Sequence, residues 1–320
     1  MRIKQQRNNA NCKIINSMKN KPVYKTIGII ANTTKENVNL VISELIKKLQ
    51  TNNFNFIVSD ALKKQRALIT REIKTINFAS EEKLCKNSDL IISIGGDGTM
   101  LTTAYKAQFY DKPVLGINFG KLGFLSEANI NQIDVLIHEI KRGSIKIEER
   151  MLITGEVIGH KVDRLVAIND IVVDKGGWPK MIEIELMVNK EYVTTFAADG
   201  IVISTPTGST GYSLSIGGPI VSPLTDAIML SPISPHSLTV RPIVLPSNLE
   251  IYIKAASLHK EILVNCDGQR VFAVPPPLKI KISKSERSLK LVKTSLTSYF
   301  ETLRNKLLWG VDLRKRTIGN

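Results

Sequence analysis

A strand that runs directly into a glycine-rich turn and then into a helix constrains the fold of this chain more than any other stretch. Residues 89–94 contain a continuous apolar run that is typical of a buried strand, and apolar residues recur at helical spacing after residue 99. The turn between them is Gly95-Gly96-Asp97-Gly98-Thr99. Its glycines let backbone N–H groups approach an anion, to which the helix N-terminus adds a positive dipole. The stretch therefore predicts a phosphate-binding turn.

Asp97 is the unusual residue of this turn, because a carboxylate repels a phosphate group. Its presence indicates a task such as accepting a proton or aligning a hydroxyl group. The alternative is a Gly-Asp turn that only caps the helix. The residues of the turn, taken alone, leave both interpretations open.

Length and composition restrict the class of protein. A chain of 320 residues, of which 43% are apolar, predicts a folded protein of about two domains. No apolar stretch approaches the roughly 20 residues of a membrane span, and no apolar secretory signal opens the sequence. The three cysteines (Cys12, Cys85 and Cys266) are odd in number and far apart, which indicates neither disulfides nor a zinc cluster. We therefore expect a cytoplasmic protein without membrane contact.

The formal net charge of +15 indicates a polyanionic partner. Part of this excess lies in the tails, since residues 1–25 contain many basic and no acidic residues and residues 314–316 are basic again. Aromatic residues make up 6% of the chain, too few for an extended base-stacking platform, so we do not expect nucleic acid as the partner. Residues 1–24 are predicted to be a flexible basic extension; an organelle transit peptide is the less favoured interpretation.

Residues 25–144 alternate between strand-like and helix-like segments. Strands are expected at 26–31, 54–58, 89–94 and 113–117, and helices at 35–50, 80–86 and 133–141. This alternation predicts a parallel sheet with helices on its faces, in which ligands bind beyond the carboxyl ends of the strands. The glycine-rich turns after residues 94 and 117 lie at such ends.

The pattern changes at residue 145 to that of a β-rich domain, which we expect to extend to residue 296. Its expected strands are 145–158, 165–173, 181–188, 192–197, 200–204, 249–254, 261–266 and 278–282. Residues 297–320 are predicted to form a C-terminal helix and tail that pack back on the first domain. The fold class is thus an α/β domain followed by a β-rich domain.

Three polar features of the second domain are candidates for binding. The pair Asn169-Asp170 interrupts an apolar run, where burial of a carboxylate requires a partner or a purpose. Asp199 precedes a strand, and the uncharged loop 205–212 offers hydroxyls and backbone donors that can hold phosphate or ribose groups. A strand end, a turn-forming aspartate and an ordinary polar turn are the respective alternatives.

Several familiar sites are excluded by their spacing. The segment 116–121 misses the P-loop pattern by one residue, and Leu122 stands where a Ser or Thr is required. No Rossmann glycine fingerprint follows the first strand. The four histidines show no metal-ligand spacing, so we expect no metal site built by the protein.

Seven motifs follow one another along the chain in an order and spacing that is highly specific. They are residues 95–99, 116–125, 169–170, 199–200, 205–213, 217–219 and 234–238. Together they resemble the motifs of the NAD kinase family, and the resemblance covers residues 26–309. The Gly-Gly-Asp-Gly-Thr motif alone is also similar to motifs of diacylglycerol kinases, sphingosine kinases and phosphofructokinases, from which the motifs of the second domain separate this chain.

The resemblance implies ATP-dependent phosphorylation of the 2′-hydroxyl of the adenosine ribose of NAD, giving NADP, with a divalent metal ion such as Mg²⁺ carried by ATP. Asp97 would be the proton acceptor. A homodimer or homotetramer is also implied, in which a neighbouring subunit contributes to the NAD site. The residues implied in substrate binding are Gly95, Gly96, Asp97, Gly98, Thr99, Phe124, Asn169, Asp170, Lys180, Asp199, Thr210, Gly211, Tyr212, Ser213, Leu214, Ser215 and Gln269.

Within this set the resemblance implies different roles. Gly98 and Phe124 would line the adenosine site, Asn169 and Asp170 would bind ribose hydroxyls of the nicotinamide half, and Asp199 would contact the nicotinamide end. The segment 210–215 would frame the adenine and its ribose.

The chain departs from the family pattern at three positions. Asp170 stands where Glu is usual, Gly211 replaces a usual Ala, and Ala197 stands where some relatives have a basic residue. Two other functions remain as alternatives. One is a lipid kinase, and the other is a dinucleotide-binding regulator without turnover, against which the intact Asp97 argues.

Overall fold

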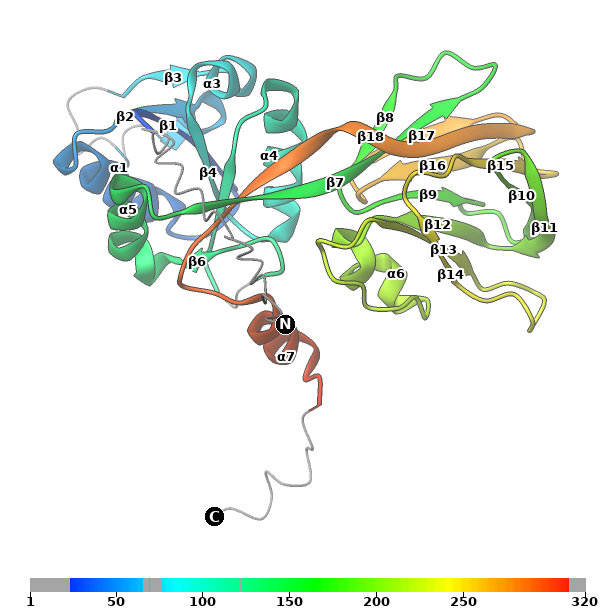
Figure 1. Cartoon of the computed structure of the whole chain (residues 1–320). Coiled ribbons are helices and arrows are strands. Elements are labelled where there is room, and N and C mark those ends of the chain that lie inside the picture. Colours follow the sequence, from blue (N-terminus) through cyan, green and yellow to red (C-terminus); the bar gives the residue numbers. More distant parts are fainter. Residues whose placement is uncertain (1–23, 66–68, 70–75, 121–122, 311–320) are drawn as a thin grey trace, which may run out of the picture.

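The computed structural model describes residues 24–65, 69, 76–120 and 123–310. The predicted extension 1–24 lies almost wholly outside these residues, as does the tail after residue 310. The described chain forms two lobes that are joined by two long strands (Figure 1).

The first lobe is an α/β domain around a parallel sheet. Its strands pair in the order β3-β2-β1-β4-β5-β6, all in parallel. In chain order the elements are β1 (Thr26–Ala31), α1 (Val38–Thr51), β2 (Asn55–Ser59), the 3₁₀ helix η1 (Asp60–Gln65), β3 (Phe78–Ala79), α3 (Glu81–Asn87), β4 (Leu90–Ile94), α4 (Asp97–Ala107), η2 (Gln108–Tyr110), β5 (Val114–Asn118), β6 (Ala128–Asn129), η3 (Ile130–Gln132) and α5 (Ile133–Arg142).

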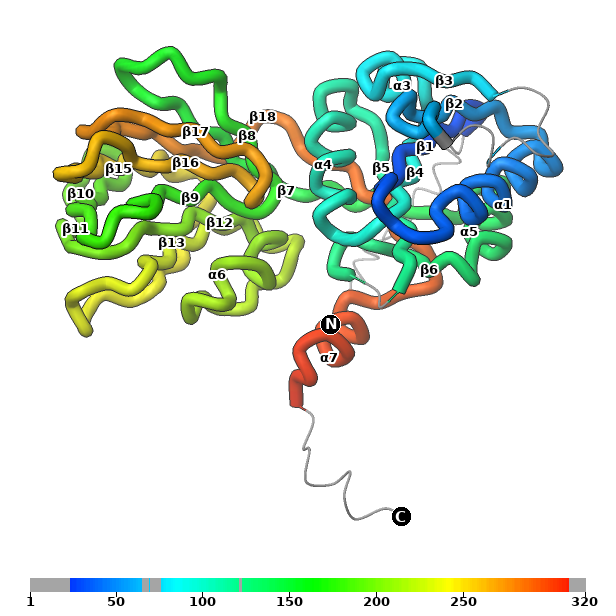
Figure 2. Tube along the Cα trace, turned by 180° about the vertical axis from the view of Figure 1, so that it is seen from behind, coloured from blue at the N-terminus to red at the C-terminus, as the bar shows by residue number. Residues whose placement is uncertain are grey.

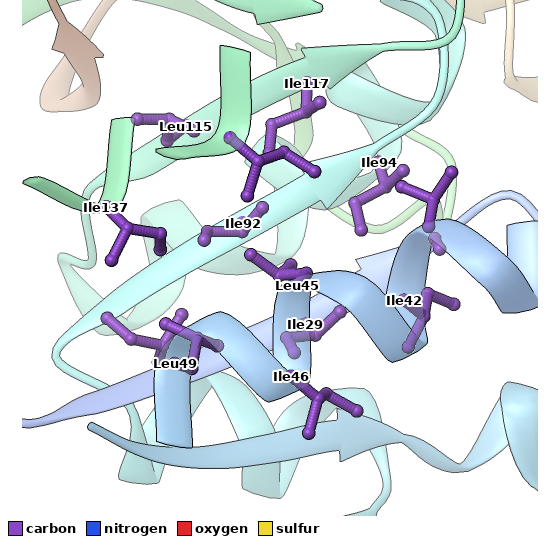
Figure 3. Close-up of a cluster of buried hydrophobic side chains, with 14 of the residues drawn as sticks. Ile29, Ile42, Leu45, Ile46, Leu49, Ile92, Ile94, Leu115, Ile117 and Ile137 are labelled. Atoms are coloured by element: carbon purple, nitrogen blue, oxygen red, sulfur yellow. The ribbon is translucent and has the colours of Figure 1, made fainter. Parts of the chain in front are cut away.

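Side chains that alternate along β1, β4 and β5 pack on both faces of this sheet. Ile29, Ile92 and Leu115 point to the face covered by α1 and α5, as Figure 3 shows. On the other face, α3 and α4 bury Leu84 and Met100 against the sheet. Because both faces are covered, the strands are almost continuously apolar. Helix α3 begins as expected from its sequence, since the side chain of the residue before it, Ser80, accepts a hydrogen bond from the Lys83 N–H.

The second lobe is a sandwich of antiparallel strands. One layer has the order β11-β10-β15-β18-β7-β8, and the other has the order β14-β13-β12-β9-β16-β17. The bounds are β7 (Lys146–Val157), β8 (Leu165–Ala167), β9 (Asp170–Asp174), β10 (Ile182–Val188), β11 (Glu191–Ala198), β12 (Gly200–Ser204), η4 (Thr207–Thr210), α6 (Tyr212–Ser215), β13 (Ala227–Ile233), β14 (Ile243–Pro246), β15 (Ile251–Ala256), β16 (Ile262–Cys266), β17 (Arg270–Val274) and β18 (Leu278–Lys293), followed by α7 (Tyr299–Leu307).

The predicted fold class, an α/β domain with a parallel sheet followed by a β-rich domain, is confirmed. The prediction of one strand was wrong, however. The run 165–173 is two strands, β8 and β9, which belong to different layers, and the chain crosses between the layers at Ile168 and Asn169. Strands β13, β14 and β17 were not expected.

Strands β7 and β18 run through both lobes (Figures 1 and 2). They pair with each other along most of their length, and Leu291 of β18 also pairs with Val114 of β5. The parallel sheet and one layer of the sandwich are therefore one continuous sheet of 12 strands. The domain boundary between residues 144 and 145 stays a prediction. The end of β18 lies far beyond residue 145 in the sequence, yet it pairs with β5 of the first lobe.

The chain after β18 returns to the first lobe. The buried carboxylate of Glu127, just before β6, accepts hydrogen bonds from Thr294 N–H at 3.1 Å and from the Thr297 hydroxyl at 2.9 Å. Glu139 of α5 accepts from Ser295 N–H at 3.3 Å. In both views α7 lies next to β6.

Candidate active site

The predicted phosphate-binding turn lies where the connections after two neighbouring strands lead in opposite directions along the sheet. Strand β4 ends at Ile94, and α4 begins at Asp97 with Gly96 as its N-cap. Strands β1 and β4 are adjacent, and the chain continues from β1 to one side of the sheet and from β4 to the other. Such a switch point, beyond the carboxyl ends of the strands, is where open α/β sheets bind ligands. Gly95 is required there, because an added Cβ would lie 2.4 Å from the Thr99 hydroxyl oxygen.

Asp97 is held by a second loop. Its carboxylate accepts a hydrogen bond from Phe124 N–H at 3.1 Å and one from Leu125 N–H at 3.3 Å. The glycine-rich segment after β5 therefore orients the carboxylate. Phe124 was predicted to line the adenosine site, whereas the part its backbone plays in holding Asp97 was not expected.

An open pocket of about 900 Å³ lies beside the turn. Its walls come from the end of β1, from α3, from α4 and from the turn between β16 and β17. Three cationic side chains line it, Lys35, Lys106 and Arg270, and Lys106 forms an ion pair with Glu81. Together with the N-terminus of α4, these cations make the pocket suitable for a polyphosphate.

Asn169 and Asp170 lie at the crossing between β8 and β9. The Asn169 side-chain oxygen is buried without a hydrogen-bond partner among the described residues. Asp170 is 5% exposed, and no described residue donates a hydrogen bond to its carboxylate. Burial, together with the nearby charge of Asp267, raises the pKa of Asp170 to about 7. Buried polar groups are normally hydrogen-bonded, so these two groups are candidates for contact with a ligand.

Asp267 is the buried neighbour of this pair. Its carboxylate accepts hydrogen bonds from the N–H groups of Ile168 at 2.9 Å, Asn169 at 2.7 Å and Asp170 at 3.3 Å, and it forms an ion pair with Arg270 at 2.8 Å. Burial raises the pKa of Asp267, but these donors favour its ionised form. Among the described residues Asp170 has no such donors, so its carboxyl group is the more easily protonated of the two.

The loop 205–215 closes around Asn169. Thr205 N–H and the Ser204 hydroxyl both donate to the Asn169 carbonyl, at 2.8 and 3.2 Å. Gly208 is packed so closely that an added Cβ would lie 2.2 Å from that oxygen. A Cβ at Gly211 would lie 3.2 Å from the Gly208 carbonyl oxygen and 3.8 Å from the Asn169 amide nitrogen, so the Ala that is usual in the family would require a small shift of that carbonyl.

Two predicted residues of this loop, Ser213 and Tyr212, differ in their exposure to solvent. Ser213 is buried and its hydroxyl bonds that of Ser231 at 3.1 Å, so it serves packing. Tyr212 is exposed. Its pKa is raised, mainly by partial burial of its hydroxyl group and to a smaller extent by the negative charges of Asp174, Asp170 and Asp199. Asp199 forms an ion pair with Lys175 at 2.6 Å.

Gln269 joins the two lobes. Its side-chain nitrogen donates to the Gly98 carbonyl at 2.7 Å, and its side-chain oxygen accepts from the Thr102 hydroxyl at 2.8 Å. Lys180 is exposed, and within the part of the chain that the structure describes no contact links it to the other predicted residues.

Sequence reasoning missed Asp267 and Arg270. A signal was present, because Asp267-Gly268 between two alternating runs is a typical hairpin turn with positive φ at both central residues. The observed φ values are 57° and 68°. The pattern could have located the hairpin, although not its contact with the first lobe.

Two further observations concern membrane spans and metal-binding groups. Among the described residues no helix is both long and apolar enough to cross a membrane. In the same residues no group of three or more His, Cys, Asp and Glu side chains could hold a metal ion.

The chain is similar to known proteins along most of its length. The sequence model of the ATP-NAD kinase N-terminal domain matches residues 27–145, and that of the ATP-NAD kinase C-terminal domain matches residues 168–294. The NAD kinase of Colwellia psychrerythraea is 37% identical over 293 residues, which are 91% of this chain and 98% of the relative. That of Flavobacterium johnsoniae is 36% identical over 280 residues, 86% of this chain and 94% of the relative.

Solved structures are also similar. Yeast NADH kinase complexed with NADH has a TM-score of 0.83 at 25% identity, covering 92% of this chain and 90% of that one. An NAD kinase from Archaeoglobus fulgidus in complex with ATP has a TM-score of 0.69 at 26% identity, covering 88% and 98%.

These matches define the protein as a phosphotransferase, in which the helix that begins at Asp97 lies beside a cationic pocket. The chain belongs to the ATP-NAD kinase family.

Proposed function

We propose that the protein transfers the γ-phosphoryl group of ATP to the 2′-hydroxyl of the adenosine ribose of NAD, giving NADP and ADP. The observation that carries the proposal is the position of Asp97. It stands at the N-terminus of α4, beside the cationic pocket, and its carboxylate is oriented by two backbone N–H groups. This position supports Asp97 as a proton acceptor at the edge of the pocket.

The reaction follows from this geometry. The 2′-oxygen forms a bond to the γ-phosphorus, the bond from the γ-phosphorus to the bridging oxygen breaks, and ADP leaves with the electron pair. Asp97 accepts the hydroxyl proton as that bond forms. Positioning and charge neutralisation dominate such a reaction, because its transition state is loose. Gly96, Gly98, Thr99 and the two lysines of the pocket, Lys35 and Lys106, supply the surroundings for the donor phosphates.

The unsatisfied groups of the second lobe support binding of NAD. We propose that Asn169 and Asp170 bind ribose hydroxyls, and that the segment 210–215 frames the adenosine. The buried Asn169 oxygen and the partnerless Asp170 carboxyl are both acceptors that ribose hydroxyls can satisfy. Asp199, Lys180 and Gln269 complete the proposed site.

We propose that a divalent metal ion, Mg²⁺, enters with the triphosphate. The described residues offer no cluster of three or more protein ligands, which favours an ion held mainly by phosphate oxygens. It would neutralise phosphate charge in the pocket, while the groups named above hold the sugar.

We also propose a cytoplasmic homodimer or homotetramer. Support for self-association comes from exposed apolar side chains on and beside the edge strands β11 and β14: Tyr192, Val193, Leu238, Ile243 and Val244. The free, buried thiols of Cys85 and Cys266 are consistent with a reducing compartment. Light scattering of the purified protein in solution measures the mass of the oligomer. A monomer at micromolar protein concentration would contradict this part of the proposal.

The test of the function is an assay of purified protein with NAD, ATP and Mg²⁺. Formation of NADP supports the proposal. Tight NAD binding without NADP would instead identify a dinucleotide-binding regulator, and phosphorylation of a lipid alcohol with no reaction of NAD would identify a lipid kinase. Repeating the assay with other triphosphates, with polyphosphate and with NADH defines the donor and acceptor range.

A further inference from the structure

We propose that the turn between β16 and β17 is a clasp that holds the two lobes in the orientation needed for phosphoryl transfer, with Arg270 as its positioning residue. The clasp consists of residues 267–270. The inference rests on the proposed function, because it concerns the alignment of the acceptor site with Asp97.

One end of the clasp holds the acceptor side. The Asp267 carboxylate accepts three consecutive N–H groups, from residues 168 to 170, where the chain crosses between the layers of the sandwich. In return, Asp267 N–H donates to the Asp170 carbonyl at 3.0 Å. The backbone that carries Asn169 and Asp170 is thus fixed to the turn.

The other end holds α4. The Arg270 guanidinium lies over the Tyr105 ring, with its central carbon 3.6 Å from the ring centroid, a close cation–π contact. Gln269 bonds Gly98 and Thr102 of the same helix. Since Asp97 is the first residue of α4, the turn connects the acceptor backbone to the proton acceptor through contiguous contacts.

Arg270 also borders the donor pocket, so a direct bond to a donor phosphate is the competing role. Its side chain is already engaged, however. It forms the ion pair with Asp267 at 2.8 Å, donates to the Val166 carbonyl at 2.8 Å and covers Tyr105 with its face. Both polar contacts come from the Nη2 nitrogen, and the third contact is through the face of the guanidinium. An arginine fixed by one nitrogen and one face is suited to fixing the geometry between lobes rather than to following a ligand.

A second arginine provides a matched control. Arg287 of β18 lies 5.8 Å from the Phe109 ring centroid, just beyond α4, and donates to the Phe109 carbonyl. Phe109 is exposed, and neither residue lines the donor pocket. Phe109 packs edge-on against Tyr105, with 5.2 Å between the ring centroids, so Arg287→Ala removes an arginine–aromatic contact one ring away from the clasp while every contact of residues 267–270 stays.

The kinetic test is a double-mutant cycle with Arg270→Ala and Tyr105→Leu. The clasp predicts that each variant lowers kcat about tenfold, that the double variant is no worse than the more severe single one, and that KM for ATP stays within about twofold. Arg270→Lys, which keeps the charge opposite Asp267, should recover part of kcat, and Arg287→Ala should match the wild type. A rise in KM for ATP at unchanged kcat, or additive losses, would overturn the clasp and assign Arg270 to the donor.

An activity-independent measurement separates this inference from the proposed function. Hydrogen exchange of the α4 amides in the ligand-free protein should accelerate in Arg270→Ala and Tyr105→Leu but not in Arg287→Ala. Equal protection in all variants would overturn the clasp. A wild type that forms no NADP would overturn the proposed function while leaving the exchange result valid. If Arg270→Ala fails to fold, Tyr105→Leu and Arg270→Lys carry both measurements.

Discussion

Gly123 lies directly against the carboxylate of Asp97: a Cβ added at Gly123 would be 1.8 Å from the Asp97 Oδ1 atom. Such a distance is impossible, so the glycine leaves the space in which the carboxylate lies. The loop after β5 and the turn after β4 are therefore shaped for each other, and the position of Asp97 depends on a residue 26 positions further along the chain.

Gly123→Ala is expected to displace the Asp97 carboxylate and to lower kcat by about a hundredfold, the cost of a misplacement of the order of 1 Å. Steady-state kinetics measures the effect. Gly120→Ala is the matched control, since an added Cβ there meets no described residue within 4 Å and the backbone needs no positive φ. Equal activity of the two variants would contradict the role of Gly123.

Asp97→Asn is expected to preserve the fold and NAD binding and to lower kcat by about two to four orders of magnitude, as for a lost general base. The amide has nearly the shape of the carboxylate but cannot accept the hydroxyl proton. Circular dichroism and NAD titration control for folding and binding. A loss of less than about threefold would rule out proton acceptance by Asp97.

Substitutions of Asp170 should change the affinity for NAD. A charge-assisted hydrogen bond is worth roughly 1.5–3 kcal/mol, so Asp170→Ala should weaken NAD by about ten- to a hundredfold, with far less effect on ATP. Asp170→Glu should be tolerated, and Asp170→Asn should fall between. Calorimetric titration tests this order; unchanged affinity in the alanine variant would make Asp170 a strand-end residue only.

NAD affinity should also depend on pH. The pKa of Asp170 in the ligand-free protein is about 7, and hydroxyl donors favour the ionised carboxylate. Affinity should therefore rise up to about tenfold per pH unit below 7 and level off above it, with proton release on binding. Titration in two buffers of different ionisation enthalpy measures that release. Asp170→Asn should lose the dependence; a wild type whose affinity falls as pH rises would show that the protonated form binds.

The same carboxyl group should reduce the stability of the ligand-free protein above neutral pH. Its folded-state pKa lies above the unfolded value, so its favourable contribution is fully present below pH 3.8 and is lost as pH rises through about 7. At about pH 8, Asp170→Asn should raise the free energy of unfolding by roughly 1–3 kcal/mol. Urea denaturation at about pH 8 and pH 4 checks this, and an equal effect at both would show that the cause is not ionisation.

Much of the α/β lobe could be predicted because its strands are covered on both faces. Their apolar runs and the helical periods between them are local signals, and β1 was expected with the bounds that the structure shows. Strand β13 was missed because Pro232 lies within it, and proline argues against a central strand. The second half of β18 was missed because its sequence is polar, although Leu289 and Leu291 are buried.

The site could be predicted in its parts but not in its assembly. The turn at Asp97 and the pair Asn169-Asp170 carry local signals, namely glycines after a strand and polar residues in an apolar run. The bond from Gln269 to Gly98 spans 171 positions, and no local pattern encodes such a contact. Asp267 was missed for the same reason, since its role depends on backbone N–H groups that are about 97–99 positions away.

The passage of β18 through both lobes bears on how the gene could be divided. A fragment ending near residue 145 would lack Leu289 and Leu291, which share an apolar cluster with Met100 and Leu101 of α4. It would also leave one side of β5 uncovered at Val114, where Leu291 pairs in the whole chain. An open strand edge, next to the apolar surface that the two leucines cover in the whole chain, promotes pairing between molecules. Expressed separately, the first lobe should aggregate, and co-expression of two fragments should restore it only if the second fragment carries residues 278–293.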